Sequence, residues 1–238
     1  MTNLRVLAWD GCVNVRDLGG LPIEGGGETR FGSIARADSI RNLNQAGWEA
    51  LAEYGTKLVI DLRSRRERDE DVVREVPIPV RHIPITPDAV PASWKWPSMR
   101  ESYLALLEAY RSEYAAVADA VAATDGPVVI HCAGGRDRTG LAVALMLRLV
   151  PVEQEAIAAD HALSDESFAP YQEDWIAQAA DDAERERRRR ISVPAGRTMV
   201  EILSEVDRRY GGPDAYLRGG GAAGSSLGAI RGRLRRDP

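Results

Sequence analysis

The sequence predicts an α/β fold in which a central, mostly parallel sheet is flanked by helices and followed by a helical C-terminal part. Two short apolar runs, at 57–62 and 128–131, have the length and β-branched content of buried strands. The segment between them, 100–123, carries apolar residues at the 3.6-residue spacing of a helix. No linker-like stretch interrupts the middle of the 238 residues, so we expect a single domain over 1–238.

The N-terminal part is expected to contain a small β element followed by one helix. Glycines at 19–20 and 25–27 mark turns around a β element that ends near 31–35. Asn42 resembles a helix N-cap, and the helical pattern that follows it stops at Gly55. This helix would lead directly into the first buried strand.

The rest of the chain alternates between strands and helices and then becomes helical. The run 181–190 is almost entirely charged, which is typical of a solvated helix face. It belongs to the segment 165–200, which we regard as a candidate helical lid. The further expected elements are a proline-bounded strand at 80–85, a strand at 128–131, a buried helix at 141–150, helices at 153–163, 165–190 and 198–210, and a last helical pair near the C-terminus.

Composition and charge argue against several classes of protein. The formal net charge is -5, from 36 acidic and 31 basic side chains, which gives no electrostatic basis for nucleic-acid binding. The first residues lack the layout of a signal peptide. The longest apolar stretch, 141–150, is interrupted by Arg148 and is too short to span a bilayer. We therefore expect a cytoplasmic protein without integral membrane association, and the sequence predicts no particular oligomeric state.

Cysteine usage points to a reactive thiol. Cys12 and Cys132 are too few for the disulfide framework of a small secreted protein. Cys132 follows His131 and begins a loop, Cys-Ala-Gly-Gly-Arg-Asp-Arg-Thr-Gly, between a buried strand and a buried helix. In a glycine-containing loop that turns into a helix, the backbone amides point inward and form a cradle for an anion such as phosphate. The segment therefore predicts a phosphate site.

The side chains of this loop have complementary chemistry. Cys132 would place its sulfur at the floor of the cradle, and Arg138, six positions later, would grip two phosphate oxygens. The positive surroundings favour the thiolate, because helix N-termini and cationic neighbours lower a cysteine pKa from ~8.5 to ~3.5–7.5. We expect Cys132 to be the nucleophile and Arg138 the clamp, with no metal or other cofactor. The other loop residues assigned to substrate binding or support are His131, Ala133, Gly134, Gly135, Arg136 and Thr139.

The loop resembles the signature of the protein tyrosine phosphatase superfamily, in particular a bacterial tyrosine and phosphoinositide phosphatase group whose loop reads His-Cys-x-x-Gly-Lys-Asp-Arg-Thr-Gly. The resemblance implies a phosphatase-like α/β fold and a cysteine-dependent reaction with a cysteinyl-phosphate intermediate. Two departures are Arg136, where the group usually has lysine, and His161, where it commonly has tyrosine. Other segments similar to motifs of the same group are Asn14-Val15-Arg16-Asp17-Leu18-Gly19-Gly20, Arg36-Ala37-Asp38, Ile60-Asp61-Leu62-Arg63-Ser64, Asp160-His161-Ala162-Leu163-Ser164 and 210–217.

An acid must protonate the leaving oxygen, and two aspartates are candidates. The resemblance implies Asp137, for which ion pairing with neighbouring arginines is the alternative. Asp88 is the second candidate, because it follows a strand where other tyrosine phosphatases carry the acid on a mobile loop; a Pro-Asp turn is its alternative. Asp61 and Arg63, at the end of a buried strand, either line the site or form ion pairs that brace the loop, and we favour bracing.

The expected substrate is a phosphorylated protein, with phosphotyrosine preferred and dual specificity left open. A phosphoinositide is the main alternative, because Arg136 adds a positive charge next to Arg138. A phosphate-binding module that has lost activity is disfavoured, because nucleophile and clamp are both present. A rhodanese-like sulfur carrier also uses a cysteine loop, but the sequence Arg138-Thr139-Gly140 argues against it.

Overall fold

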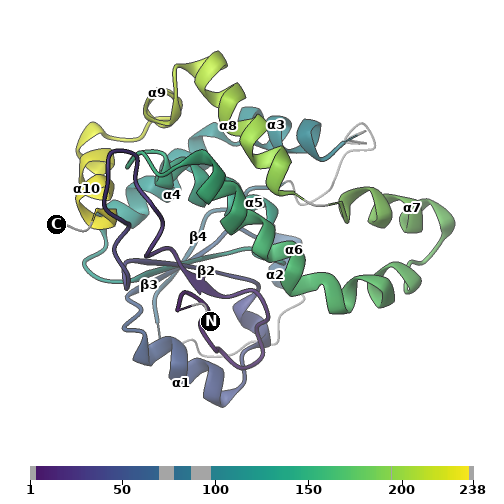
Figure 1. The fold of residues 1–238 in the computed structure, drawn as a ribbon. Coiled ribbons are helices and arrows are strands. Elements are labelled where there is room, and N and C mark those ends of the chain that lie inside the picture. Colours follow the sequence, from purple (N-terminus) through teal and green to yellow (C-terminus); the bar gives the residue numbers. More distant parts are fainter. Residues whose placement is uncertain (1–3, 70–77, 87–97, 194, 236–238) are drawn as a thin grey trace.

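The computed structural model describes residues 4–69, 78–86, 98–193 and 195–235 (Figure 1). Within these residues, five strands form one sheet in the order β1-β2-β5-β3-β4. The first pair is antiparallel and the other pairs are parallel, so the predicted mostly parallel sheet is confirmed. The strands are β1 Arg16–Asp17, β2 Ile34–Ala37, β3 Leu58–Asp61, β4 Val80–His82 and β5 Val128–His131.

Helices cover both faces of this sheet. In Figure 1, α1 lies on one side of the sheet, and α3, α4 and α5 lie on the other. Helix α7 and the C-terminal part of α6 extend away from the body of the molecule. No helix in the described ranges is long and apolar enough to cross a membrane. The helices are α1 Gln45–Glu53, α2 Arg65–Asp69, α3 Met99–Ala109, α4 Arg111–Ala123, α5 Asp137–Leu147, α6 Gln154–Ala177, α7 Asp182–Ile191, α8 Gly196–Tyr210, α9 Pro213–Gly219 and α10 Gly224–Leu234.

The sheet separates two hydrophobic cores. Successive side chains of a strand point to opposite faces, so Val128 and Ile130 of β5 enter the larger core with α3, α4 and α5. Val129 enters the smaller core, where Trp9 and Leu51 also lie. The run 128–131 is therefore buried on both sides, which explains why it is apolar without alternation.

Parallel pairing brings the carboxyl ends of three strands to one edge. His131, the last residue of β5, lies opposite Ala37 of β2 and Asp61 of β3. The loop that follows His131 therefore leaves the sheet between the segments that follow β2 and β3. In an open α/β sheet this edge is where ligands bind.

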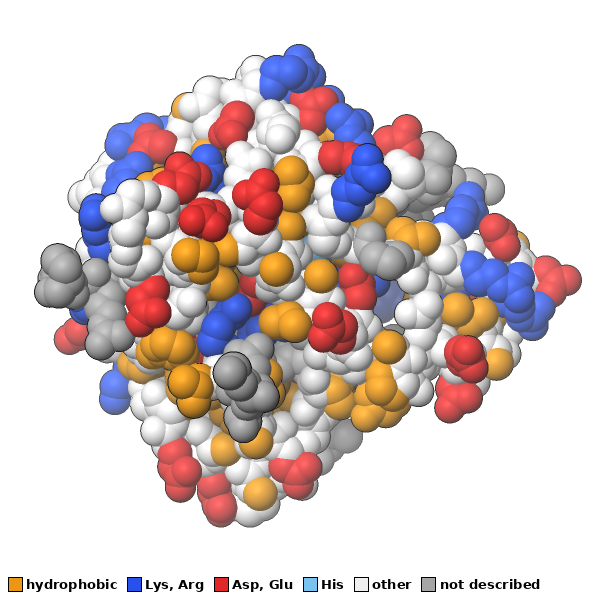
Figure 2. Space-filling model, in the orientation of Figure 1, with side chains coloured by type: hydrophobic (Ala, Val, Ile, Leu, Met, Phe, Trp, Pro, Cys, Tyr) orange, Lys and Arg blue, Asp and Glu red, His pale blue; other side chains and the backbone are white. Residues whose placement is uncertain are grey.

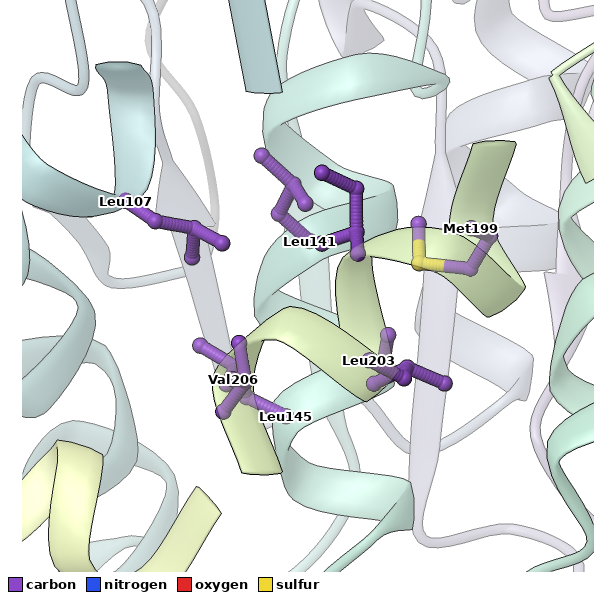
Figure 3. Close-up of a pocket in the computed structure, with 8 residues that line it drawn as sticks. Leu107, Leu141, Leu145, Met199, Leu203 and Val206 are labelled. Atoms are coloured by element: carbon purple, nitrogen blue, oxygen red, sulfur yellow. The ribbon is translucent and has the colours of Figure 1, made fainter. Parts of the chain in front are cut away.

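The C-terminal helices belong to the larger core. Figure 3 shows Met199, Leu203 and Val206 of α8 facing Leu141 and Leu145 of α5, with Leu107 of α3 beside them. All side chains that line this space are apolar, so we interpret it as a packing contact between helices. Acidic and basic side chains are interspersed over the outer face shown in Figure 2.

Two helix starts differ from the sequence prediction. Asn42 lies inside a short 3-10 turn at Ile40–Asn42, and Asn44 is the N-cap of α1, where its side chain accepts a hydrogen bond from the Gly47 amide. The extended backbone of Asn44 is the conformation that a capping residue needs. Helix α5 begins at Asp137 and ends at Leu147, instead of spanning 141–150, because the second half of the loop forms its first turn.

The segment 100–123 forms two helices instead of one. The break lies at Tyr110, between α3 and α4, and the next residue makes a tertiary contact. The Arg111 side chain donates hydrogen bonds to the carbonyls of Ala215 and Tyr216 in α9. Downstream, α6 runs without interruption through the predicted boundary near 164, and the side chain of Asp181 caps a separate α7.

Candidate active site

The loop after β5 has a backbone that only glycine allows at one position. Gly135 has φ +64, and a Cβ there would lie 2.3 Å from the carbonyl oxygen of Ala37 in β2. Cys132, at the start of the loop, is 2% exposed and lies at the end of β5. The tight turn thus places a buried thiol beside the N-terminus of α5.

The carbonyl groups of the loop are held away from its interior. The oxygens of residues 133, 134 and 135 accept hydrogen bonds from the Ser39 amide (3.0 Å), Asn14 Nδ2 (2.8 Å) and Arg36 Nη2 (2.7 Å). The amides of residues 133–135, 137 and 138 donate to no acceptor in the described part of the chain. Helix α5 also starts without a side-chain cap. These donors are therefore free to bind an anion, which is what the predicted cradle requires.

The Arg138 guanidinium is oriented by a carboxylate on another element. Its Nη1 and Nη2 donate to the two carboxylate oxygens of Glu67 in α2, at 2.7 and 2.8 Å, and Nη1 also lies 3.2 Å from Thr86 Oγ1. Partial burial opposes ionisation of Glu67, but the hydrogen bonds and charge of Arg138 outweigh it and lower the pKa of Glu67 to about 2. A bidentate pair of this kind fixes the plane of the guanidinium.

The sequence prediction missed Glu67, although a local signal was present. Ser64 and Glu67 form a capping box, in which Ser64 Oγ accepts from the Glu67 amide and Glu67 Oε2 accepts from the Ser64 amide. The pattern Ser-x-x-Glu directly after β3 would have placed Glu67 in the first turn of a helix at the carboxyl edge of the sheet.

Asp137, in the first turn of α5, accepts two hydrogen bonds on the same oxygen. Oδ1 lies 2.5 Å from the Tyr103 hydroxyl and 3.0 Å from Arg136 Nε. Burial alone would raise the pKa of Asp137, but the charge of Arg136 and the hydrogen bond from Tyr103 outweigh it, and the pKa lies below its ordinary value. The Asp137 side chain remains 41% exposed, so a ligand in the cradle could reach it.

Arg136 connects the loop to the helical part. Its Nη1 lies 3.2 Å from Asp165 Oδ1 in α6, and Asp165 Oδ2 accepts a hydrogen bond from the Ala195 amide before α8. The positive charge of Arg136 is thus shared between Asp137 and Asp165. The planar guanidinium makes both contacts at once, which the ammonium of lysine does less well.

Asp61 and Arg63 pair with each other beside the loop. Arg63 Nη2 lies 2.9 Å from Asp61 Oδ2, and His131 Nε2 lies 3.8 Å from Asp61 Oδ1. Although burial raises the pKa of Asp61, the charges of His131 and Arg63 lower it overall. His131 Nδ1 lies 3.2 Å from the Cys132 carbonyl. These contacts connect the end of β3 to the first residues of the loop.

A buried ion cluster lies behind the cradle. Asp160 of α6 pairs with three arginines, Arg5, Arg16 and Arg36, and the carboxylate and the side chains of Arg16 and Arg36 are nearly inaccessible. Burial would raise the pKa of Asp160, but the arginines hold it far below its ordinary value. Because Arg36 also binds the Gly135 carbonyl, the cluster joins α6, β1 and β2 to the loop.

Two further residues were predicted to belong to the site. Thr139 is fully buried, and its hydroxyl has no hydrogen-bond partner among the residues that the structure describes. Asp88, the second acid candidate, lies outside the described residues. The structure therefore brings Cys132, Arg136, Asp137, Arg138 and Thr139 together in one strand–loop–helix unit.

The α/β fold and the strand–loop–helix unit are those that the sequence resemblance implies for a phosphatase. The sequence matches the tyrosine phosphatase family over residues 7–236. The chain belongs to this family. The match confirms the predicted enzyme class, a phosphoric monoester hydrolase of the protein tyrosine phosphatase type.

Curated relatives come from bacteria. A protein of Cupriavidus necator that is provisionally named a tyrosine-protein phosphatase is 29% identical, over 89% of this chain and 82% of the relative. A tyrosine-protein phosphatase of Nostoc commune is 25% identical, over 85% of this chain and 74% of the relative. The triple specificity protein phosphatase PtpB of Mycobacterium tuberculosis is 29% identical over 45% of this chain and 44% of its own length.

Proposed function

We propose that this enzyme hydrolyses phosphotyrosine in proteins through a cysteinyl-phosphate on Cys132. The observation that carries the proposal is the cradle itself, in which unpartnered amides, the uncapped start of α5 and Arg138 surround the end of β5 where Cys132 lies. Together these groups favour an anion and would stabilise both the thiolate and the phosphoryl group.

In the first step, the Cys132 thiolate attacks phosphorus and the bond to the leaving oxygen breaks. Amide hydrogens and the Arg138 guanidinium bind the non-bridging oxygens, whose charge is spread in the transition state. Glu67 and Thr86 together use both Nη1 hydrogens and one Nη2 hydrogen of Arg138, which leaves Nε–H and the second Nη2 hydrogen for phosphate. The buried Thr139 hydroxyl is available to donate to the sulfur when water later displaces it from phosphorus.

Asp137 is the proposed general acid and base. Its pKa is low without a ligand, but a phosphate dianion beside it raises the pKa, because like charges disfavour ionisation. Protonated Asp137 then gives its proton to the leaving oxygen. In the second step, its carboxylate takes a proton from the water that attacks the cysteinyl-phosphate.

The choice of substrate rests on the residues around the cradle. A phosphoinositide is the second candidate, because Arg136 adds a positive charge two residues from the clamp. Turnover of phosphotyrosine peptides and of phosphoinositides, measured at equal enzyme concentration, separates the two candidates. A kcat/KM for phosphoinositides that exceeds the value for the peptides would favour the second.

The decisive test is hydrolysis of p-nitrophenyl phosphate in EDTA by the wild type and Cys132→Ser. We expect activity that survives chelation, is blocked by vanadate, and is absent in the variant. Full activity in Cys132→Ser would end the proposal. Binding of phosphate without any turnover by the wild type would indicate a phosphate-binding module, and thiosulfate turnover without phosphatase activity would indicate a sulfur carrier.

A further inference from the structure

The two oxygens of the Asp137 carboxylate are not equivalent. Oδ1 accepts both the Tyr103 hydroxyl (2.5 Å) and Arg136 Nε (3.0 Å), whereas Oδ2 has no hydrogen-bond partner among the described residues. When one carboxyl oxygen already accepts two hydrogen bonds, the proton of the neutral acid is carried by the other oxygen. The contacts therefore leave Oδ2 as the oxygen that can hold a transferable proton.

Tyr103, from α3, is fixed by a second contact behind Asp137. Its hydroxyl lies 3.0 Å from Nε2 of His161 in α6, and the two rings meet edge to face with centroids 5.8 Å apart. Burial raises the pKa of Tyr103 well above its ordinary value, and Asp137 adds to that effect, so the phenol stays protonated. Its single proton goes to Asp137 Oδ1, and its oxygen must then accept from His161.

The surroundings of His161 fix which nitrogen carries the proton. Burial, followed by the charge of Arg36, lowers the pKa of His161 to about 3, so the ring is neutral and carries one proton. Nδ1 is buried and has no partner in the described part of the chain. A Cβ on Gly140 would lie 2.4 Å from this nitrogen, so the α5 backbone at Gly140 packs directly against it. Nε2 is therefore the donor to Tyr103.

Several charged and titratable groups face this chain of hydrogen bonds. From the loop and α5 they are Cys132, Arg136 and Arg138, from α6 they are Asp160 and Asp165, from β2 it is Arg36, and from α4 it is Tyr114. All of these groups are retained in the Tyr103 and His161 variants described below, so a comparison among variants isolates the effect of Tyr103 and His161.

We propose that His161 and Tyr103 are positioning residues that direct the Asp137 proton to Oδ2, where the leaving oxygen takes it. The inference rests on the proposed role of Asp137 as the acid. In the first step, the Cys132 sulfur bonds to phosphorus as the oxygen–phosphorus bond breaks, the Oδ2 proton moves to the leaving oxygen, and Tyr103 stabilises the carboxylate that forms. In the second step, water loses a proton to Oδ2 as its oxygen bonds to phosphorus and the sulfur–phosphorus bond breaks. Tyr103 and His161 keep their protons throughout.

The test compares leaving groups, because a misplaced acid matters only when the leaving oxygen needs a proton. Phenyl phosphate releases phenol, with a pKa of about 10 like tyrosine, whereas p-nitrophenolate leaves without much help. For Tyr103→Phe we expect kcat/KM with phenyl phosphate, which reports only the step in which the leaving oxygen departs, to fall about tenfold or more, as for a lost hydrogen bond to a charged group. The kcat/KM with p-nitrophenyl phosphate should change little. His161→Leu should follow the same pattern. His161→Gln, whose amide can replace Nε2–H, should keep kcat/KM for phenyl phosphate near the wild-type value.

The pH profile supplies a second readout. Without the Tyr103 hydrogen bond the Asp137 carboxylate is less stabilised, so its pKa rises and the basic limb of kcat/KM for phenyl phosphate should move to higher pH. Tyr171→Phe, at an exposed tyrosine of α6, is the matched control and should leave both readouts unchanged.

Equal losses of kcat/KM with both leaving groups and an unmoved basic limb in Tyr103→Phe would overturn the inference, as would an unchanged kcat/KM with both. Asp137→Asn, measured in parallel, separates this failure from that of the proposed function. If Asp137→Asn shows the leaving-group dependence and the other variants do not, the acid is correct and the positioning role is wrong. If Asp137→Asn also lacks the leaving-group dependence, Asp137 is not the general acid, and the inference is wrong as well.

Discussion

At the scale of single residues, Glu67 uses one carboxylate for two purposes. It completes the capping box of α2 and holds Arg138 in place, and these functions can be separated. In Glu67→Gln the amide can still complete the capping box, but the clamp loses its charged bidentate partner. We expect kcat/KM for p-nitrophenyl phosphate to fall about tenfold, equivalent to ~1.4 kcal/mol.

Ser64→Ala is the opposite variant. It removes the capping oxygen and leaves the Glu67 carboxylate on Arg138, so we expect a loss of about 1 kcal/mol in unfolding free energy with kcat/KM nearly unchanged. Urea denaturation and steady-state kinetics on both variants measure the two effects. A tenfold loss of activity in Ser64→Ala would show that the position of α2, and not the carboxylate, controls Arg138.

Asp160 offers a prediction on stability. In Asp160→Asn the buried Arg16 and Arg36 lose their shared counter-charge, so we expect urea denaturation at pH 7 to show a loss of about 3–5 kcal/mol. Glu166→Gln, at an exposed position of the same helix, should stay within about 0.5 kcal/mol of the wild type.

The same variant has a defined pH dependence. The folded pKa of Asp160 is depressed, so its contribution is complete above the ordinary aspartate pKa of ~3.9 and is lost as the pH falls below that value. The stability difference between wild type and Asp160→Asn should therefore be constant from about pH 5 to 8 and shrink below about pH 4. A difference that shrinks already between pH 7 and 5 would contradict this assignment.

The site residues that the sequence predicted are those whose partners lie nearby in the chain. Cys132 and Arg138 are six positions apart in one loop, so their relation is visible as a pattern. Tyr103 and Asp137 are 34 residues apart, and Arg36 and Asp160 are 124 apart. Neither spacing follows from helical or strand periodicity, so these pairs required the fold.

At the scale of elements, the loop depends on the different conformations of two neighbouring glycines. A Cβ on Gly135 would combine φ +64 with a 2.3 Å approach to the Ala37 carbonyl, whereas a Cβ on Gly134 would make only an ordinary 3.6 Å contact with Phe168. We expect Gly135→Ala to lose activity at least about 100-fold, because a displacement of about 1 Å in a catalytic site costs that much. Gly134→Ala should retain activity within a few-fold.

Kinetics with p-nitrophenyl phosphate and circular dichroism on the two glycine variants provide the measurement. Circular dichroism confirms that both proteins are folded before their rates are compared. Similar rates in both variants would mean that the loop does not need the left-handed backbone at position 135.

The sequence located strands better than helix boundaries. The run 128–131 was predicted at its observed limits, because a short apolar segment between a Gly-Pro turn and a polar loop has few alternatives. The break at Tyr110 has no such signal, since apolar periodicity continues through it, and the side chain that follows the break, Arg111, contacts the distant α9. Helix boundaries set by distant contacts are not encoded in local periodicity.

At the scale of the whole molecule, the sheet separates two cores that depend on each other. Alternate residues of β3 and β5 enter opposite cores, with Ile60 and Ile130 on one side and Val59 and Val129 on the other. The active-site loop leaves the sheet between these cores, and α8 covers the helix that follows the loop. A substitution that loosens either core should therefore also disturb the active-site loop.

This coupling predicts that residues 1–238 unfold as one cooperative domain. Leu203 of α8 is 2% exposed and packs near α5, so Leu203→Ala should lower the unfolding free energy by about 2–5 kcal/mol. Ser204→Ala, at the next and exposed position, should change it by less than about 0.5 kcal/mol. Because a single domain opens as a unit, Leu203→Ala should lower the free energy of exchange of the Val59 and Val129 amides by the same amount as the unfolding free energy. Hydrogen exchange under native conditions measures this, and faster exchange confined to α8, α9 and α10, with the strands unaffected, would show that the C-terminal helices form a separate folding unit.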